Sequence, residues 1–174
     1  SGEKVVEACR DAGNGTEVAV AANLNEPNQT VISGDPPAVE RAGERCRAAG
    51  AKRVVPLKVS GAFHSPLMEP ARAGLRDALS SVTLHDPAFP VVSNAGAEPV
   101  RDAGAARHWL EQQIVSPVRW VESMAELARL GGGARFVEIG PGNVLSGMAK
   151  RNVAGASVVT LGTADEVGRF LEAA

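Results

Sequence analysis

The chain has 174 residues, a length that corresponds to about one domain. Eighteen Lys and Arg side chains nearly balance twenty Asp and Glu side chains, and this net charge of −2 argues against a partner that is nucleic acid or an anionic membrane. The apolar stretches are strand-sized, shorter than the roughly 20 residues that span a bilayer, and no secretory signal opens the chain, so a cytoplasmic α/β protein is expected.

The sequence pattern of the first 59 residues predicts a small lobe. Helix formers and apolar spacing predict a helix over residues 3–12, and a short apolar run predicts a strand over 17–23. After a five-residue turn rich in Asn and Pro, a second strand is expected over 29–34. A helix over 36–49, with Pro36 in its first turn, and a strand over 52–59 complete the lobe.

This order of elements is a ferredoxin-like βαββαβ unit whose first strand is missing. Such a sheet would leave a strand position vacant, with unpaired backbone groups at its edge. The chain also begins Ser-Gly-Glu-Lys, without a methionine. Together these features predict an incomplete domain, with a small lobe over 1–59 and part of a larger lobe over 60–174.

In the larger lobe, helices and strands alternate, which is typical of a parallel sheet. The expected helices cover residues 68–81, 105–114, 118–130, 144–152 and 164–173, and the expected strands cover residues 90–93, 135–139 and 157–161.

His64 is the first candidate for chemistry. It follows a predicted strand within a tight turn, and the carboxyl end of a strand is where α/β folds place ligands and reactive groups. A neutral imidazole there could act as a general base and acid near pH 7, and the alternative is a loop histidine satisfied by hydrogen bonds. His85 lies in a turn and His108 lies on a helix, and structural roles are expected for both.

The sequence offers this base no nucleophile. It has no Gly-x-Ser-x-Gly elbow, and Ser65 is rejected because neighbours in sequence rarely point at each other. Cys9 and Cys46 fall within predicted helices and are expected to be buried, reduced thiols. The glycines on either side of Pro141 are expected to form a structural turn rather than an anion cradle, and no carboxylate spacing predicts a metal site.

Five short stretches resemble the malonyl-CoA:acyl-carrier-protein transacylases and the acyltransferase domains of polyketide and fatty-acid synthases. They are NLNEPNQTVISG at 23–34, VSGAFHSPLM at 59–68, PVVSN at 90–94, Gln113 with SPVRW at 116–120, and EIGPGNVL at 138–145. Their order matches the C-terminal part of such a domain. The resemblance therefore implies that the larger lobe is the C-terminal part of an α/β-hydrolase-like parallel-sheet subdomain.

The resemblance also implies a reaction and roles for residues. Malonyl would pass from coenzyme A to a serine, and then to the phosphopantetheine thiol of acyl carrier protein, without a cofactor. His64 matches the catalytic histidine, and Gln113 matches the residue whose backbone carbonyl orients it. Phe63 matches a position that contacts the malonyl group, and Asn23 and Gln29 match a loop at the mouth of the cleft.

The serine elbow, the oxyanion-hole glutamine and the arginine that pairs with the malonyl carboxylate belong to the N-terminal part of the family's domain, and this sequence contains none of them. Three interpretations follow. The chain is part of a malonyl transacylase whose N-terminal part is missing, a non-catalytic module that binds carrier protein, or a hydrolase that uses His64 with another nucleophile.

Overall fold

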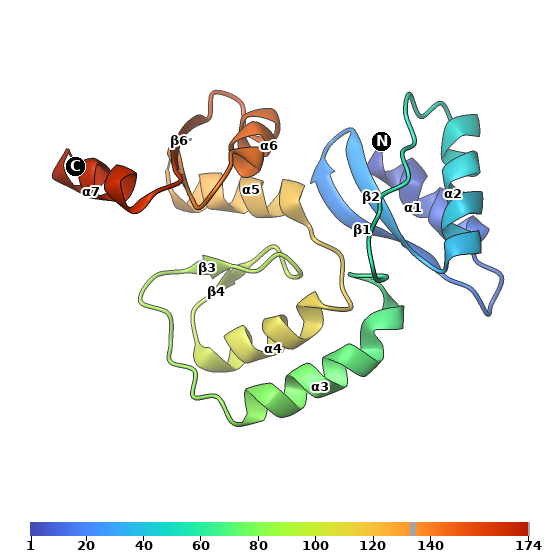
Figure 1. The fold of residues 1–174 in the computed structure, drawn as a ribbon, viewed down its shortest axis with the longest axis horizontal. Coiled ribbons are helices and arrows are strands. Elements are labelled where there is room, and N and C mark those ends of the chain that lie inside the picture. The colour runs from blue at the N-terminus through green and yellow to red at the C-terminus, as the bar shows by residue number, and fades with distance from the viewer. Residues whose placement is uncertain (133–134, 174) are drawn as a thin grey trace. The chain divides into compact units, whose positions relative to one another are not determined.

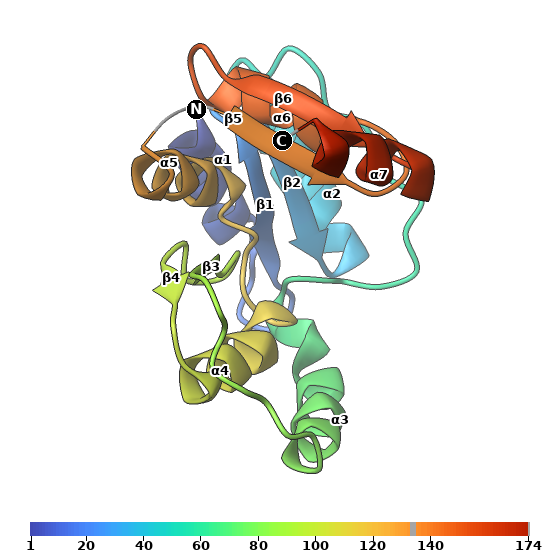
Figure 2. The same cartoon turned by 90° about the vertical axis from the view of Figure 1, so that its left-hand side faces the viewer.

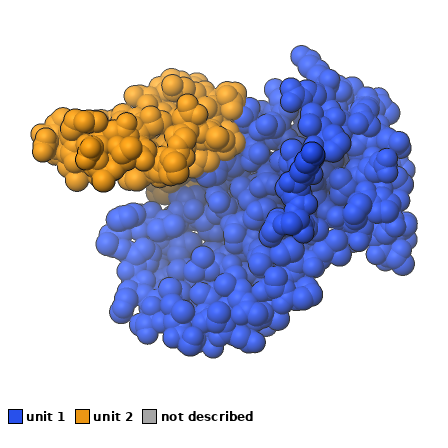
Figure 3. Space-filling view, viewed as in Figure 1, with its two compact units in different colours: residues 1–123 blue, residues 124–174 orange. Residues whose placement is uncertain are grey.

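The computed structural model describes residues 1–132 and 135–173, which form a mixed α/β fold. The chain divides into two compact units, residues 1–123 and residues 124–174 (Figure 3). The predicted lobe boundary between residues 59 and 60 concerns the whole domain and stays a prediction.

The first unit begins with two helices packed on one strand hairpin (Figures 1 and 2). Helix α1 (Gly2–Ala12) and helix α2 (Pro36–Ala48) enclose the antiparallel strands β1 (Ala19–Glu26) and β2 (Gln29–Gly34) in sequence. Both helices contact each other and both strands, as expected from the apolar stripe on each helix. Small side chains make this contact close, and the buried cluster consists of Cys9, Ala12, Ala19, Ala38 and Ala42, with Val5, Ile32 and Val39 packed against it.

The hairpin turn is shorter than the sequence suggested. Glu26 pairs directly with Gln29, so only two residues form the turn, and the expected five-residue loop is wrong. The register shifts between Ala21 and Asn23, and again between Leu24 and Glu26. These irregularities let β1 continue through a segment whose Asn and Pro content predicted a loop.

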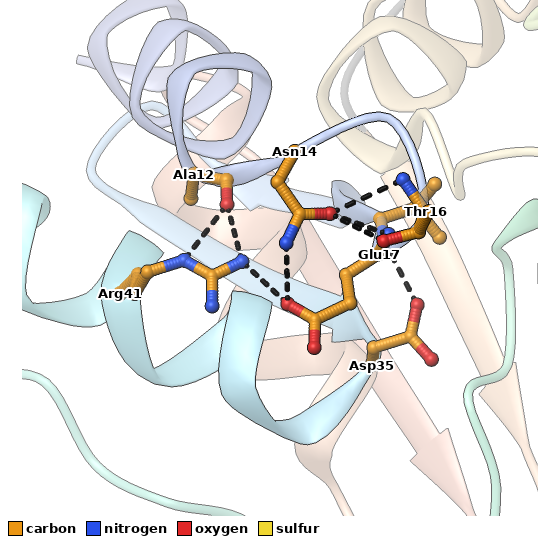
Figure 4. Close-up of polar contacts among 7 residues, drawn as sticks. Ala12, Asn14, Thr16, Glu17, Asp35 and Arg41 are labelled. Carbon is orange, nitrogen blue, oxygen red and sulfur yellow. Dashed lines mark hydrogen bonds and ion pairs between the residues drawn. The ribbon is translucent and has the colours of Figure 1, made fainter.

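A polar network fixes the connection from α1 into β1 (Figure 4). The guanidinium of Arg41 donates to the Ala12 carbonyl at 2.7 and 3.0 Å and to the Glu17 carboxylate at 2.7 Å. The Asn14 side-chain oxygen accepts from the backbone N–H of Glu17 at 2.8 Å, and Asp35 accepts from the N–H of Val18 at 2.9 Å. Glu17 is therefore part of a loop, and for this reason β1 begins later than predicted.

The strand expected over residues 52–59 is absent, and that prediction is wrong. This segment is extended, but within the described residues no strand pairs with it. Its alternate apolar side chains, Val55, Leu57 and Val59, are 51, 58 and 66% exposed. The period-2 pattern of a strand is present, but a strand also needs a neighbour to accept its backbone hydrogen bonds.

The rest of the first unit positions the histidine turn. A short helical turn η1 (Pro66–Met68) leads into α3 (Glu69–Ser80), which packs against α4 (Ala103–Gln113). Between these helices in the sequence, β3 (Val91–Val92) and β4 (Pro99–Val100) form a small antiparallel ribbon. Sequence reasoning expected one longer strand over 90–93 and missed β4, which has only two residues.

The second unit contains a parallel strand pair. Strand β5 (Arg135–Ile139) pairs in parallel with β6 (Ser157–Leu161), as the alternating pattern predicted. Helix α6 (Val144–Asn152) connects the two strands, and α7 (Ala164–Glu172) follows β6. Helix α5 (Trp120–Leu130) crosses from the first unit into the second. Among the described residues, no helix is long and apolar enough to cross a membrane.

Candidate active site

His64 lies at the apex of a tight turn with a backbone φ of +60°. This left-handed conformation is uncommon for a residue with a Cβ atom, and it is frequent at functional sites. The backbone N–H of His64 donates to the carbonyl of Ile114 at 3.2 Å. The turn is thereby fixed to the end of helix α4, which lies 50 residues further along the chain.

The imidazole of His64 is held by the same segment. Its Nδ1 lies 2.9 Å from the backbone oxygen of Gln113. A carbonyl oxygen only accepts, so this hydrogen bond requires the hydrogen on Nδ1 and leaves the lone pair on Nε2. The structure therefore brings together the two predicted catalytic residues, with Nε2 as the nitrogen that is free to take a proton.

The two predicted site residues on the hairpin, Asn23 and Gln29, differ in whether they lie near the Gln113 segment. Asn23 forms a bridge with Val118, whose N–H and carbonyl bond to Ala22 and Leu24 at 2.8 Å. Asn23 is therefore beside the segment that follows Gln113. Gln29 is exposed at the start of β2, and no contact in the described structure joins it to His64.

Phe63 is not a core residue of the described chain. Its side chain is 47% exposed and its ring lies over Gly61, where an added Cβ atom would meet it at 3.4 Å. The ring therefore lies next to the histidine turn and is partly exposed. This placement leaves its predicted contact with a malonyl group as a proposal.

Two arginines on α3 brace the end of α4, and sequence reasoning missed them. Arg76 forms an ion pair with Glu111 at 3.1 Å, and Arg72 lies 3.4 Å from the side-chain oxygen of Gln112. These contacts fix the last turn of α4, which supplies the Gln113 and Ile114 carbonyls. The pairs join residues 35 and 40 positions apart, so no local spacing could have indicated them.

The remaining histidines and cysteines lie apart from this arrangement. His85 is exposed in a loop, and His108 is exposed on α4, where its ring meets Trp109 edge to face at 5.0 Å. Cys9 and Cys46 are free and buried, as predicted. Burial raises the pKa of the Cys9 thiol to about 12, and the nearby Cys46 adds to the shift, so this thiol is a poor nucleophile.

The turn between the glycines 140 and 142 does not present an open anion site. The carboxylate of Glu138 accepts from the N–H groups of Leu145 and Ser146 at 3.1 and 2.8 Å, and also from the Ser146 hydroxyl. These bonds hold the pKa of Glu138 below its ordinary value, with the Ser146 hydroxyl as the largest cause. The first turn of α6 is thus occupied by the protein's own carboxylate.

Two surface depressions among the described residues lie along α1, and neither is lined by a residue of the histidine turn. The larger, about 380 Å³, is lined by Gly2, Glu3, Val6, Glu7, Arg10 and Leu24. In the part of the chain that the structure describes, no group of three or more His, Cys, Asp or Glu side chains could hold a metal ion.

A neutral histidine whose Nδ1–H is held by a backbone carbonyl keeps a lone pair on Nε2, as a general base requires. The family model of the acyl transferase domain matches residues 3–171, and the chain belongs to that family. Within it, the chain is a member of the malonyl-CoA:acyl-carrier-protein transacylase family, as the resemblance of its motifs predicted.

Its relatives include the malonyl CoA-acyl carrier protein transacylases of Salmonella typhimurium and Bacillus subtilis. Each is 42% identical over 149 residues, which cover 86% of this chain but 48 and 46% of those proteins. The chain therefore spans about half the length of these relatives.

Solved structures agree with the sequence relatives. An acyl carrier protein S-malonyltransferase from Vibrio cholerae matches with a TM-score of 0.90 and 38% identity, over 97% of this chain and 54% of that one. A malonyl-transacylase solved in complex with its type II polyketide-synthase acyl-carrier protein matches with a TM-score of 0.90 and 40% identity. That match covers 99% of this chain and 55% of the solved one.

Proposed function

We propose that this chain is the C-terminal part of an S-malonyltransferase, the half that supplies the base and its orienting carbonyl. In this proposal residues 1–59 belong to a ferredoxin-like lobe, and residues 60–174 belong to an α/β-hydrolase-like lobe of a cytoplasmic enzyme. The substrates are malonyl-CoA and acyl carrier protein, whose complex with a relative supports the second partner. The observation that carries the proposal is the 2.9 Å contact between His64 Nδ1 and the Gln113 carbonyl.

The first half of the reaction forms an acyl-serine. Nε2 of His64 takes the hydroxyl proton of a serine from the N-terminal part of the domain as the serine oxygen bonds to the thioester carbon. The carbon–sulfur bond then breaks, and the proton passes from the imidazole to the sulfur of coenzyme A. The Gln113 carbonyl stabilises the imidazolium, since it accepts the hydrogen of Nδ1 throughout.

The second half transfers malonyl to the carrier protein. Nε2 takes the proton of the phosphopantetheine thiol as its sulfur bonds to the acyl carbon. The ester bond to serine breaks, and the serine oxygen regains a proton from the imidazole. The histidine returns to its starting state, so no cofactor enters the balance of atoms.

A non-catalytic carrier-protein module is the second candidate. It is favoured by one observation: in the described part of the chain, no serine or cysteine hydrogen-bonds to His64. Such a module would bind acyl carrier protein with or without malonyl and would gain no activity when it is joined to an N-terminal half. The experiment that follows separates it from the enzyme.

The test completes the domain. Fusing the chain to the N-terminal half of the Salmonella relative should give malonyl transfer that is measured by mass spectrometry of the carrier protein. His64→Ala should slow acyl-serine formation by about 10² to 10⁴, the worth of a positioned proton transfer. His85→Ala and His108→Ala are matched controls, because both residues are exposed and no hydrogen bond in the described structure joins either ring to Gln113. Equal losses for all three variants would contradict the role of His64.

A further inference from the structure

Ser65 is a fully buried polar residue directly after the histidine. Its exposed fraction is 0%, although it lies in a turn of the surface between Phe63 and η1. Polar side chains without exposure need hydrogen-bond partners, and Ser65 has two. Its hydroxyl donates to the carbonyl of Ala62 at 2.6 Å and accepts from the N–H of Leu67 at 3.3 Å.

These two bonds close the backbone on both sides of His64. Ala62 lies two residues before the histidine and Leu67 lies three residues after it, so one hydroxyl ties the strained turn to the start of η1. Helix η1 continues into α3, which is braced to the end of α4 through Arg76 and Glu111. The φ of +60° at His64 is uncommon for a non-glycine residue and persists only where neighbouring contacts enforce it.

The direction of the imidazole depends on that backbone conformation. If the turn relaxed to a negative φ, the Cα–Cβ bond of His64 would point elsewhere, and the contact from Nδ1 to the Gln113 carbonyl would be lost. The carbonyl then no longer selects the hydrogen on Nδ1, and free imidazole distributes its hydrogen between both nitrogens. Nε2 would present a lone pair for only part of the time.

We propose that Ser65 is a positioning residue, whose buried hydroxyl holds the left-handed turn that presents His64 Nε2 as the base. This inference rests on the proposed function only in that it takes His64 as the base. Ser65 itself does not touch the imidazole in this scheme, and its bonds run to Ala62 and Leu67.

The experiment reads the imidazole directly in the 174-residue chain, so it needs no nucleophile. Two-bond proton–nitrogen NMR spectra at pH 8, where imidazole is neutral, distinguish hydrogen on Nδ1 from hydrogen on Nε2, and loss of the signal in His64→Gln assigns it. The unaltered chain should carry its hydrogen mainly on Nδ1. Ser65→Ala should lower the ratio of the Nδ1–H tautomer to the Nε2–H tautomer at least about fivefold, which corresponds to the free energy of a typical hydrogen bond.

A second buried serine provides the matched control. Ser123 is 1% exposed and donates its hydroxyl to the carbonyl of Arg119 at 2.8 Å, as Ser65 does to Ala62. Ser123→Ala should cost similar stability and leave the His64 tautomers unchanged. Ser65→Cys replaces the hydroxyl with a somewhat larger thiol that is only a weak donor. It should give a tautomer ratio between those of the unaltered chain and Ser65→Ala, and it serves if Ser65→Ala does not fold.

Each outcome separates the two proposals. An unchanged tautomer ratio in the folded Ser65 variants, or an equal shift in Ser123→Ala, would overturn the role of Ser65 and leave the proposed function intact. Hydrogen found mainly on Nε2 in the unaltered chain would contradict the base geometry, and with it the proposed function and the role of Ser65.

Discussion

At the scale of single residues, the candidate site depends on the backbone conformation of His64 and on the backbone carbonyl that its imidazole contacts. The imidazole of His64 is oriented by the backbone carbonyl of Gln113 rather than by a carboxylate. A neutral partner places no negative charge beside the imidazole, so the ring is oriented without a buried ion pair that would have to be desolvated. The same turn carries the exposed ring of Phe63, the residue directly before His64.

Phe63 provides the prediction that belongs to this scale. In the resembling family, phenylalanine before the histidine is typical of malonyl-selective members and serine of methylmalonyl-selective ones. In the completed enzyme, Phe63→Ser should raise the ratio of kcat/KM for methylmalonyl-CoA over malonyl-CoA at least about tenfold, because the rigid ring occupies the volume of an α-methyl group. Competition between both substrates, read by mass spectrometry, measures the ratio.

The melting temperature serves as the control for Phe63→Ser. It should barely change, because the side chain is 47% exposed. A fall in melting temperature with an unchanged substrate ratio would assign Phe63 to packing and not to selectivity.

At the scale of elements, the first unit relies on close backbone approach. Gly34 ends β2 with a φ of +151°, and a Cβ atom there would lie 2.1 Å from the carbonyl oxygen of Val18. That oxygen is backbone, and it already accepts from the N–H of Asp35 at 2.9 Å. It cannot move without opening the junction between β2 and α2.

Gly34→Ala should therefore lower the free energy of unfolding by about 3 kcal/mol or more. Gly74→Ala is its opposite: this glycine lies exposed within α3, an added Cβ atom meets nothing within 4 Å, and a gain of about 0.5–1 kcal/mol is expected. Urea denaturation of both variants measures the two changes. Similar effects of the two substitutions would contradict the steric explanation.

Glu138 should make the stability of the second unit depend on pH. Its folded-state pKa lies below the ordinary value, so its bonds to α6 stabilise the fold above that value, near pH 4.3, and are lost as the pH falls through the folded pKa. Helix α6, followed by the NMR signals of residues 144–152, should then unfold at a lower temperature at pH 3 than at pH 6. Glu138→Gln should flatten this dependence.

Glu172→Gln is the control for this titration. It removes one carboxylate from the same unit at the last residue of α7, where no helix N-terminus is affected. An equal loss of pH dependence in Glu172→Gln would assign the effect to net charge rather than to the contact of Glu138 with α6.

The helices and the parallel pair could be predicted largely from pattern, and the site could not. The bounds of β5, α6 and β6 match the predicted ones, since short amphipathic or apolar runs end at clear glycine and turn signals. The prediction of a strand over 52–59 was wrong because strand pairing needs a second segment, which the local apolar pattern does not reveal. The contacts of His64 with Gln113 and Ile114, and the brace from Arg76 to Glu111, join residues that are 35 or more positions apart. The role of Gln113 came from the family resemblance alone.

At the scale of the whole molecule, the described residues include the proposed base, and no serine or cysteine among them hydrogen-bonds to it. We expect the 174-residue chain alone to give no malonyl carrier protein from malonyl-CoA, because residues of one catalytic constellation act as a unit and loss of the nucleophile removes many orders of magnitude in rate. Mass spectrometry of the carrier protein after incubation measures this. Transfer above the uncatalysed rate would contradict it and would require a nucleophile within residues 1–174.

The bonds of His64 also set an order in time. The partners of its N–H and Nδ1 are the carbonyls of Ile114 and Gln113, so neither bond can form on the ribosome before that segment has been made. At roughly 5–20 residues per second, about 50 residues take some 3 to 10 seconds. Throughout that interval the histidine turn has no partner in α4. His64 is therefore synthesised before the carbonyls that orient it, and its imidazole reaches its final direction only after they have been made.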